Sequence, residues 1–327
     1  MTSTQNTSAD LFVAVTRSVP GMLSIENATV RCAGDGVLKP ADMKQFAAGA
    51  SVLVTMYHDR VDADLLDAIG SQIKGVCNFA VGFNNIDLEA CRQRGVVVTN
   101  TPNAVTEGTA DLAWALLLAV ARGIVPADRY ARSRAYPDNG PLSMSAFSGA
   151  DLTGRNLLIV GAGRIGFGVA MRSLGWGMRV QYVARSRHWD FELAPLAAQR
   201  VSLEEGLRNA DVVSLHVPLS PATTHLIDAK ALSLMKPNAI LINTARGPIV
   251  DEAALAQALK ENRIYGAGLD VYEREPEVYP GLLDLDNVTL TPHIGSAEVR
   301  YREMMTDMVS ENVNAILAGK EPPNRIA

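Results

Sequence analysis

The feature that most constrains the fold is a glycine-rich turn between an apolar run and a helix-like stretch. Leu157-Leu-Ile-Val160 leads directly into Gly161-Ala-Gly163-Arg-Ile-Gly166. In such a G-x-G-x-x-G turn the first glycine permits a tight bend and the second lets the backbone approach a pyrophosphate. The third allows a helix to pack closely on the strand, and the N–H groups at the start of that helix attract phosphate. The motif predicts a dinucleotide site; a tight turn in an unrelated α/β sheet is the alternative. The expected contacts in the turn are Gly161, Ala162, Gly163, Arg164, Ile165 and Gly166.

The end of the next apolar run indicates which dinucleotide is bound. An NAD site usually places Asp or Glu there, about 20 residues after the turn, to accept hydrogen bonds from the ribose 2′-hydroxyl. Here Arg179–Val183 is followed by Ala184-Arg185-Ser186-Arg187, without an acidic residue. Because Arg pairs with phosphate through two charge-assisted hydrogen bonds, Arg185, Ser186 and Arg187 favour NADP(H), with NAD(H) possible. The alternative is that these arginines only decorate an exposed loop.

Short apolar runs alternate with helix-like stretches along the chain, which is typical of parallel sheets with helices on both faces. A first series of strands is expected at Leu11–Thr16, Ser51–Thr55, Ile73–Phe79 and Val96–Thr99. A second is expected at Asn156–Val160, Arg179–Val183, Val212–His216, Ala239–Asn243, Gly266–Val271 and Thr289–Pro292. The prediction is an α/β protein of two Rossmann-like or flavodoxin-like domains. Residues 1–102 and 294–327 form the substrate domain, and the cofactor domain, 103–293, is inserted between them.

Length and charge agree with two domains and exclude some partners. The 327 residues suit two domains of ordinary size, and 48% hydrophobic residues are enough for packed cores. The formal net charge is −5, from 30 Lys and Arg against 35 Asp and Glu. A mildly acidic chain has no overall attraction to nucleic acid or to an anionic membrane, so neither is an expected partner.

Cysteine usage and the apolar runs indicate the compartment. Cys32, Cys77 and Cys91 are widely spaced, which argues against a disulfide framework, and no His, Cys, Asp or Glu cluster has metal-ligand spacing. Met1–Asp10 carries no Lys or Arg and no apolar core, unlike a signal peptide. The longest apolar run, Leu112–Ala121, is about half of what a bilayer requires. We expect a cytoplasmic protein without a metal.

From Asp10 to Pro322 the chain resembles the D-isomer-specific 2-hydroxyacid dehydrogenases, particularly the glyoxylate/hydroxypyruvate reductase branch. Besides the glycine turn, the matching blocks are Ala80-Val-Gly-Phe-Asn-Asn-Ile-Asp87, Thr99-Asn-Thr-Pro102, Thr109-Ala-Asp-Leu-Ala113, Ser214-Leu-His-Val-Pro-Leu219, Asn243-Thr-Ala-Arg-Gly247, Gly268-Leu-Asp-Val271, Glu275-Pro276 and Thr291-Pro-His-Ile-Gly-Ser296. The resemblance implies the interleaved two-domain architecture predicted above. It also implies NAD(P)-dependent reduction of a small 2-keto acid, such as glyoxylate or hydroxypyruvate, to glycolate or D-glycerate.

The resemblance implies a catalytic trio of Arg246, Glu275 and His293. Arg can hold a carboxylate by two N–H bonds, and His, with an ordinary pKa near neutrality, suits a general acid in reduction. Glu275 would hydrogen-bond the other ring nitrogen, fix the tautomer and favour the imidazolium. Each residue also has an ordinary structural alternative: a loop-capping Arg, an interior His with satisfied hydrogen bonds, and an exposed loop Glu.

Further site residues are likewise implied by the resemblance. Backbone N–H groups of Val81 and Gly82 would bind the substrate carboxylate, and Tyr57 with Met56 would line the pocket or simply pack. His216, near the expected adenosine side, is assigned a structural role. Beyond the turn and the arginine loop, the cofactor contacts are expected at Thr109, Val217, Pro218, Thr244, Ala245, Asp270 and Gly295, with Asp270 facing the nicotinamide carboxamide.

Several alternatives remain open. The segment 136–149 lacks the tryptophans that many glyoxylate reductases carry there, which leaves room for 2-ketogluconate, pyruvate or phosphohydroxypyruvate as substrate. A distant alternative is a dinucleotide-sensing binding protein that resembles corepressors of the same fold. The resemblance also implies a homodimer, for which Leu112–Ala121 is either an interface helix or a core helix.

Overall fold

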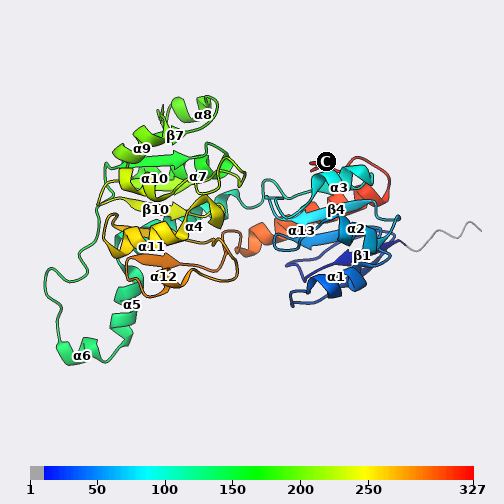
Figure 1. The fold of residues 1–327 in the computed structure, drawn as a ribbon, viewed down its shortest axis with the longest axis horizontal. Coiled ribbons are helices and arrows are strands. Elements are labelled where there is room, and N and C mark those ends of the chain that lie inside the picture. The colour runs from blue at the N-terminus through cyan, green and yellow to red at the C-terminus, as the bar shows by residue number, and fades with distance from the viewer. Residues whose placement is uncertain (1–10) are drawn as a thin grey trace, which may run out of the picture. The chain divides into compact units, whose positions relative to one another are not determined.

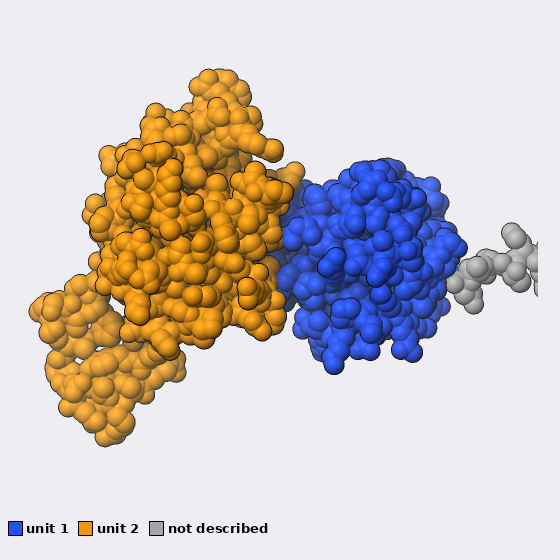
Figure 2. All heavy atoms as spheres, in the orientation of Figure 1, with its two compact units in different colours: residues 1–105, 296–327 blue, residues 106–295 orange. Residues whose placement is uncertain are grey.

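The computed structural model describes residues 11–327, which form two compact units (Figure 2). Unit 1 contains the chain up to Val105 and resumes with Ser296–Ala327, and unit 2 consists of Thr106–Gly295. The predicted boundaries, after residues 102 and 293, fall slightly before these positions. The expected lack of a leader in Met1–Asp10 concerns residues outside the described part.

Unit 1 is built on a five-stranded parallel sheet with the strand order β2-β1-β3-β4-β5. This order is that of flavodoxin-like folds. Its strands are β1 (Phe12–Val15), β2 (Thr29–Cys32), β3 (Val52–Met56), β4 (Gly75–Phe79) and β5 (Val97–Thr99). Its helices are α1 (Pro40–Ala47), α2 (Ala63–Ile69), α3 (Leu88–Gln93) and α13 (Val299–Leu317).

Alternate residues of these strands enter two separate cores, as a parallel sheet buried on both faces requires. Leu53 and Val76 pack with α1, α2 and α3 on one face. Val54 and Cys77 pack on the other face with Val309, Val313 and Ile316 of α13. The last helix of the chain therefore completes the core of the first sheet, which explains why unit 2 is an insertion (Figure 1).

Unit 2 holds a seven-stranded parallel sheet with the order β12-β11-β10-β9-β6-β7-β8. The strands are β6 (Asn156–Val160), β7 (Arg179–Val183), β8 (Gln199–Arg200), β9 (Val212–Leu215), β10 (Ile240–Asn243), β11 (Gly266–Leu269) and β12 (Val288–Leu290). The α-helices are α4 (Thr106–Ala121), α5 (Ile124–Arg132), α6 (Ala135–Asn139), α7 (Arg164–Arg172), α8 (Trp189–Glu192), α9 (Leu203–Asn209), α10 (Ala229–Leu234), α11 (Glu252–Lys260) and α12 (Pro280–Leu283).

The strand order of unit 2 reverses between the neighbours β6 and β9. From β6 the chain proceeds outward to β7 and β8, then crosses back to β9 and proceeds the other way. Such a reversal leaves a crevice outside the carboxyl ends of the two central strands, where ligands of open α/β sheets bind. Alternating strand residues again fill two cores, with Leu157 and Ile159 facing α4 and α7, and Leu158 and Val160 facing α9, α10 and α11.

The α/β class with parallel sheets is confirmed, and most strands lie where the apolar runs predict them. The sequence analysis missed β2 and β8, because β2 is exposed along its whole length and β8 has two exposed residues. The helix predicted at Leu112–Ala121 is part of α4, whose buried residues include Leu116 and Leu117, so it is a core helix. Within residues 11–327 no single helix is long and apolar enough to cross a membrane, although α4 and α5, bent by 64°, pass such a test together.

We expect the substitution Ile316→Ala to destabilise the protein through the contact of α13 with β4. Ile316 is 5% exposed, and its Cδ1 lies 2.6 Å from where a Cβ on Gly75 would stand. Truncating a buried Ile leaves a cavity that costs about 2–5 kcal/mol. Circular dichroism during thermal unfolding should show a midpoint several degrees lower. The control Leu283→Ala, at a residue 55% exposed, should stay close to the original midpoint. Equal midpoints for the two variants would contradict this packing.

Candidate active site

The glycine turn after β6 has the geometry of a phosphate cradle. Gly161 has φ +107°, and a Cβ there would lie 2.6 Å from the carbonyl carbon of His216. A Cβ on Gly166 would lie 2.3 Å from the carbonyl oxygen of Gly161. By contrast, Gly163 faces open space at the N-cap of α7, and no side chain caps that helix. Two glycines are thus required by the packing of the chain itself, and the third leaves room for a ligand at uncapped N–H groups.

Other predicted cofactor residues lie at the carboxyl ends of neighbouring strands. Val217 and Pro218 follow β9, and Thr244 and Ala245 follow β10. Because all strands are parallel, these ends meet at the edge that carries the glycine turn. The hydroxyl oxygen of Thr244 is buried, and it has no hydrogen-bond partner among the described residues. A buried polar atom of this kind calls for a partner, and a polar group of a bound dinucleotide would supply one. The residues of this edge therefore fit a nicotinamide dinucleotide.

The predicted arginine loop follows β7, with Arg185, Ser186 and Arg187 exposed. Arg187 is held locally, because its Nε donates to Glu192 at 2.5 Å and its guanidinium lies 4.4 Å from the ring centroid of Trp189. The bond to Nε leaves both terminal nitrogens of this guanidinium for other acceptors. Arg187 is therefore oriented by α8 and is not a loosely placed surface charge.

The structure brings His293 and Glu275 into direct contact. Nδ1 of His293 lies 2.7 Å from Oε2 of Glu275, and the two side chains are 21% and 25% exposed. The other oxygen of Glu275 accepts the backbone N–H of Tyr272 at 3.1 Å. Burial raises the pKa of Glu275, but His293, the Tyr272 N–H and the charge of Arg246 outweigh burial and lower the pKa below its ordinary value. Glu275 is thus a carboxylate at neutral pH that accepts from one nitrogen of the ring.

His293 has a strained backbone that a buried carboxylate holds in place. Its φ of +56° is in the left-handed region that only glycine adopts easily. Asp270, which is 1% exposed, accepts the Thr291 hydroxyl at 2.6 Å and the N–H groups of Ile294 and Gly295 at 2.8 Å each. Burial raises the pKa of Asp270, and these donors offset part of the rise. Asp270 therefore fixes both flanks of His293, a structural task that the sequence analysis did not assign to it.

Thr109 contributes to the same arrangement. Its Oγ1 donates to the carbonyl of Gly295 at 3.2 Å. A Cβ on Gly295 would lie 3.3 Å from Oγ1 of Thr109. Thr109 and Gly295, both predicted as cofactor contacts, are therefore neighbours beside the carboxylate of Asp270. Their direct contact with a cofactor stays a prediction.

The segment that carries Glu275 is fixed by residues that sequence reasoning missed. The backbone N–H of Glu252 donates to the carboxylate of Glu273 at 2.9 Å, and the N–H of Glu273 donates to the carboxylate of Glu252 at 2.9 Å. A Cβ on Gly247 would lie 1.8 Å from the carbonyl carbon of Tyr272, so only glycine fits there. These reciprocal hydrogen bonds join residues that are distant in sequence, so no local sequence pattern predicts them.

Arg246 lies next to Gly247 in sequence and close to Glu275 in space. It precedes the short turn Gly247–Ile249, and its Nη1 donates to the carbonyl of Ala245 at 2.6 Å. Asn243, at the end of β10, donates to the carbonyl of Arg246 at 3.0 Å. Arg246 also lies close enough to Glu275 for its charge to help lower the pKa of that carboxyl. The three residues of the predicted trio are thus gathered in unit 2.

The predicted substrate-binding residues of unit 1 lie on a loop after β4. Three consecutive carbonyls of this loop, those of Ala80, Val81 and Gly82, accept the Thr101 N–H at 3.0 Å and the side-chain amides of Asn100 at 2.8 Å and Asn78 at 2.7 Å. In a planar trans peptide the N–H points away from the carbonyl. The N–H groups of Val81 and Gly82 have no acceptor within residues 11–327. This loop therefore presents donors to an external anion.

The remaining candidates have simpler surroundings. Tyr57 follows β3 and is 39% exposed, whereas Met56 is buried. His216 contacts the hydroxyl of Ser214 at 2.8 Å, and burial lowers the pKa of this imidazole to about 3, so it is neutral and structural. No group of His, Cys, Asp and Glu in the described part of the chain could hold a metal ion.

Comparisons with known proteins find relatives that cover most of the chain. Residues 114–295 match the family model of the D-isomer specific 2-hydroxyacid dehydrogenase, NAD binding domain. A glyoxylate reductase of Thermococcus onnurineus is 47% identical over 278 residues, covering 84% of this chain and 82% of its own length. A putative 2-hydroxyacid dehydrogenase of Staphylococcus aureus is 40% identical, covering 88% of this chain and 90% of its own length.

Solved structures have the same fold. A Thermus thermophilus protein of known crystal structure is 43% identical, with a TM-score of 0.90 over 97% of this chain and 100% of that chain. An NADPH-dependent glyoxylate/hydroxypyruvate reductase of Sinorhizobium meliloti, solved with NADP and malonate, is 32% identical, with a TM-score of 0.81 over 98% and 97% of the two chains. The chain therefore belongs to the D-isomer specific 2-hydroxyacid dehydrogenase family and is an NAD(P)-dependent oxidoreductase.

Proposed function

We propose that the protein reduces glyoxylate and hydroxypyruvate to glycolate and D-glycerate, with NADPH as the preferred cofactor. The observation that carries this proposal is the 2.7 Å contact of His293 with Glu275 beside the positive charge of Arg246. An imidazole that can donate a proton, next to a cation, is what protonation and stabilisation of a developing alkoxide require. The glyoxylate reductases among the relatives support this choice of substrate.

The proposed mechanism divides the work among the residues of the trio. When bound at the glycine turn, NADPH would provide the hydride for reduction of the keto acid at C2. Arg246 holds the substrate carboxylate through two N–H bonds and stabilises negative charge on the carbonyl oxygen. His293 donates its Nε2 proton to that oxygen, because Nδ1 is turned to Glu275. The Glu275 carboxylate keeps the ring oriented and stabilises the imidazolium before the proton leaves.

Unit 1 is proposed to supply further donors to the substrate. The N–H groups of Val81 and Gly82 are suited to a carboxylate, since the Thr101 N–H and the Asn100 amide hold the carbonyls of Ala80 and Val81 on the opposite side of the same two peptides. Tyr57 is proposed to line the substrate site.

The preference for NADPH rests on Arg185, Ser186 and Arg187 after β7. These residues offer two guanidinium groups and a hydroxyl where an NAD site usually carries an acidic residue. The Sinorhizobium meliloti relative, described as NADPH-dependent, supports the same choice.

We further propose a cytoplasmic homodimer. Unit 2 carries a projecting arm, defined as residues 124–150, which contains α5 and α6 (Figure 1). Neither helix has a buried residue, and Tyr136, Met144 and Phe147 of the arm are exposed. An exposed apolar arm suits burial against a second copy. Light scattering should give about twice the mass of one chain.

The proposed cytoplasmic location rests on the cysteines. The three free cysteines suit a reducing compartment.

The first test is a comparison of both cofactors with several keto acids. Oxidation of NADPH or NADH is followed by the absorbance of the reduced nicotinamide, with glyoxylate, hydroxypyruvate, pyruvate and 2-ketogluconate. We expect glyoxylate or hydroxypyruvate to be the best substrate, and kcat/KM to be at least about tenfold higher with NADPH. A higher kcat/KM with pyruvate or 2-ketogluconate would replace the proposed substrate, and turnover with NADH alone would refute the cofactor preference.

The substitution Arg246→Ala should lower kcat/KM for the keto acid by about 100-fold or more, because it removes the cation at the developing oxyanion. Binding of NADPH, measured by fluorescence titration, should change little. The matched control is Arg92→Ala, at an exposed residue of α3 whose ion-pair partner in the described part of the chain is Glu89 of the same helix. Activity of Arg246→Ala equal to that of the control would exclude the proposed role.

The substitution Glu275→Gln should change the pH dependence of reduction. Reduction needs the imidazolium form of His293, so the rate falls as pH rises and the ring loses its proton. The carboxylate of Glu275 favours the imidazolium and thus extends the fast range upward. With a neutral amide in its place, the pH above which reduction slows should move down. The profile of kcat/KM against pH measures this, and an unchanged upper limit would speak against the pair.

A further inference from the structure

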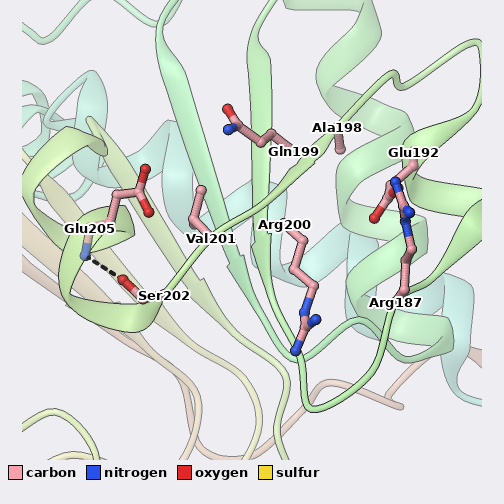
Figure 3. A pocket seen from close by; sticks show the side chains of 8 residues that line it. All are labelled: Arg187, Glu192, Ala198, Gln199, Arg200, Val201, Ser202 and Glu205. Atoms are coloured by element: carbon pink, nitrogen blue, oxygen red, sulfur yellow. Dashed lines mark hydrogen bonds and ion pairs between the residues drawn. The ribbon is translucent and has the colours of Figure 1, made fainter.

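The loop that follows β7 is anchored by a side chain from a different strand. Arg200, on the edge strand β8, donates from Nε to the carbonyl of Ala184 at 3.1 Å and from Nη2 to the carbonyl of Arg185 at 2.9 Å. Figure 3 shows this side chain reaching toward the loop, while Arg187 is directed back toward Glu192. One planar guanidinium therefore ties down two consecutive peptides, a geometry that its fixed fork of donors allows.

These two hydrogen bonds fix the direction of the peptide N–H groups. Because each peptide is planar and trans, a carbonyl that points toward Arg200 turns the N–H of the following residue away from it. The N–H groups of Arg185 and Ser186 therefore point away from β8, and neither has an acceptor within residues 11–327. Successive N–H groups that point to one side form a site for an anion.

The other end of the loop has its own anchor. Arg187 is oriented by Glu192 and Trp189 of α8, and Glu192 in turn accepts the hydroxyl of the buried Tyr182 at 2.6 Å. The hydrogen bonds of Tyr182 and Arg187 hold the pKa of Glu192 below its ordinary value, so it is a carboxylate. Arg187 is thus placed without the help of Arg200, and the carbonyls of Ala184 and Arg185 are placed by Arg200.

Arg200 and Arg187 both line a pocket of about 770 Å³ beside this loop. The remaining lining residues are Glu192, Ala198, Gln199, Val201, Ser202 and Glu205. Nε and Nη2 of Arg200 already donate to backbone carbonyls. Arg200 therefore affects ligand binding mainly by fixing the conformation of the loop.

We propose that Arg200 is a positioning residue that sets the selectivity for a ribose 2′-phosphate over a 2′-hydroxyl. It acts by holding Ala184 and Arg185 so that the loop presents its N–H groups and its arginines together. This inference rests on the proposed preference for NADPH, since that preference places the 2′-phosphate at the loop. The inference adds Arg200 to the residues that determine cofactor selectivity, although Arg200 lies outside the loop, on the neighbouring strand β8.

The test uses the fragment ligands 2′,5′-ADP and ADP with the full chain, measured by calorimetry, and steady-state kinetics with NADPH and NADH. In Arg200→Ala, binding of 2′,5′-ADP should weaken about tenfold and KM for NADPH should rise by the same factor. Binding of ADP, KM for NADH and kcat should each stay within about twofold. Retained ADP binding also demonstrates that the variant is folded.

Two further variants separate position from charge. Arg200→Lys keeps the positive charge but lacks the planar fork, so it should lose most of the selectivity that Arg200→Ala loses. Arg208→Ala, on α9 and paired within residues 11–327 with Glu204 alone, should behave like the original protein. Full selectivity in Arg200→Lys would overturn the inference, because charge alone would then account for the effect.

The outcomes distinguish this inference from the proposed function. If the original protein binds 2′,5′-ADP no more tightly than ADP, the proposed preference for NADPH fails, and the inference fails with it. If the original protein prefers 2′,5′-ADP and Arg200→Ala keeps that preference, only the inference fails.

Discussion

The common direction of the seven strands in unit 2 is the constraint on which its site depends. In a parallel sheet every strand ends at the same edge, so residues that follow β6, β7, β9, β10 and β11 meet there although they span more than a hundred residues of sequence. The reversal of strand order between β6 and β9 opens this edge where Gly161 packs on the backbone of His216. Burial of the strands on both faces keeps the edge rigid.

In both units, a side chain binds backbone carbonyls of a loop and thereby orients the N–H groups of that loop. At the loop after β4, the amide of Asn100 holds the carbonyl of Val81, and at the loop after β7 the guanidinium of Arg200 holds the carbonyls of Ala184 and Arg185. In each case the planar peptide turns the N–H groups to the opposite side, where an anion can bind. At both loops, donors for the proposed carboxylate and phosphate would thus be oriented by side chains that need not touch the ligand. Such preparation lowers the cost of ordering a loop when the ligand arrives.

Nearby hydrogen bonds offset the backbone strain at His293. A left-handed conformation at a residue other than glycine costs about 1–3 kcal/mol, and His293 carries that cost. The carboxylate of Asp270 binds the residues on both sides of His293, and Glu275 holds the ring itself. The backbone strain directs the imidazole, and the surrounding hydrogen bonds keep it from relaxing. Because Asp270 and Glu275 come from segments close to β11, the orientation of the ring depends on that strand.

The sequence by itself determined the α/β class, most strands and the glycine turn, and the family resemblance predicted the trio, because these features are local patterns. Apolar runs of strand length, glycines at fixed spacing and short blocks around Arg246, Glu275 and His293 are all visible without the fold. Only the tertiary structure revealed the roles of Asn100, Asp270, Glu252 and Arg200. Each of these residues acts on backbone atoms far away in the sequence, and a hydrogen bond between distant segments leaves no periodicity or spacing that a single sequence could display. The edge strands β2 and β8 were missed for a related reason, since exposed strands need no apolar residues to form.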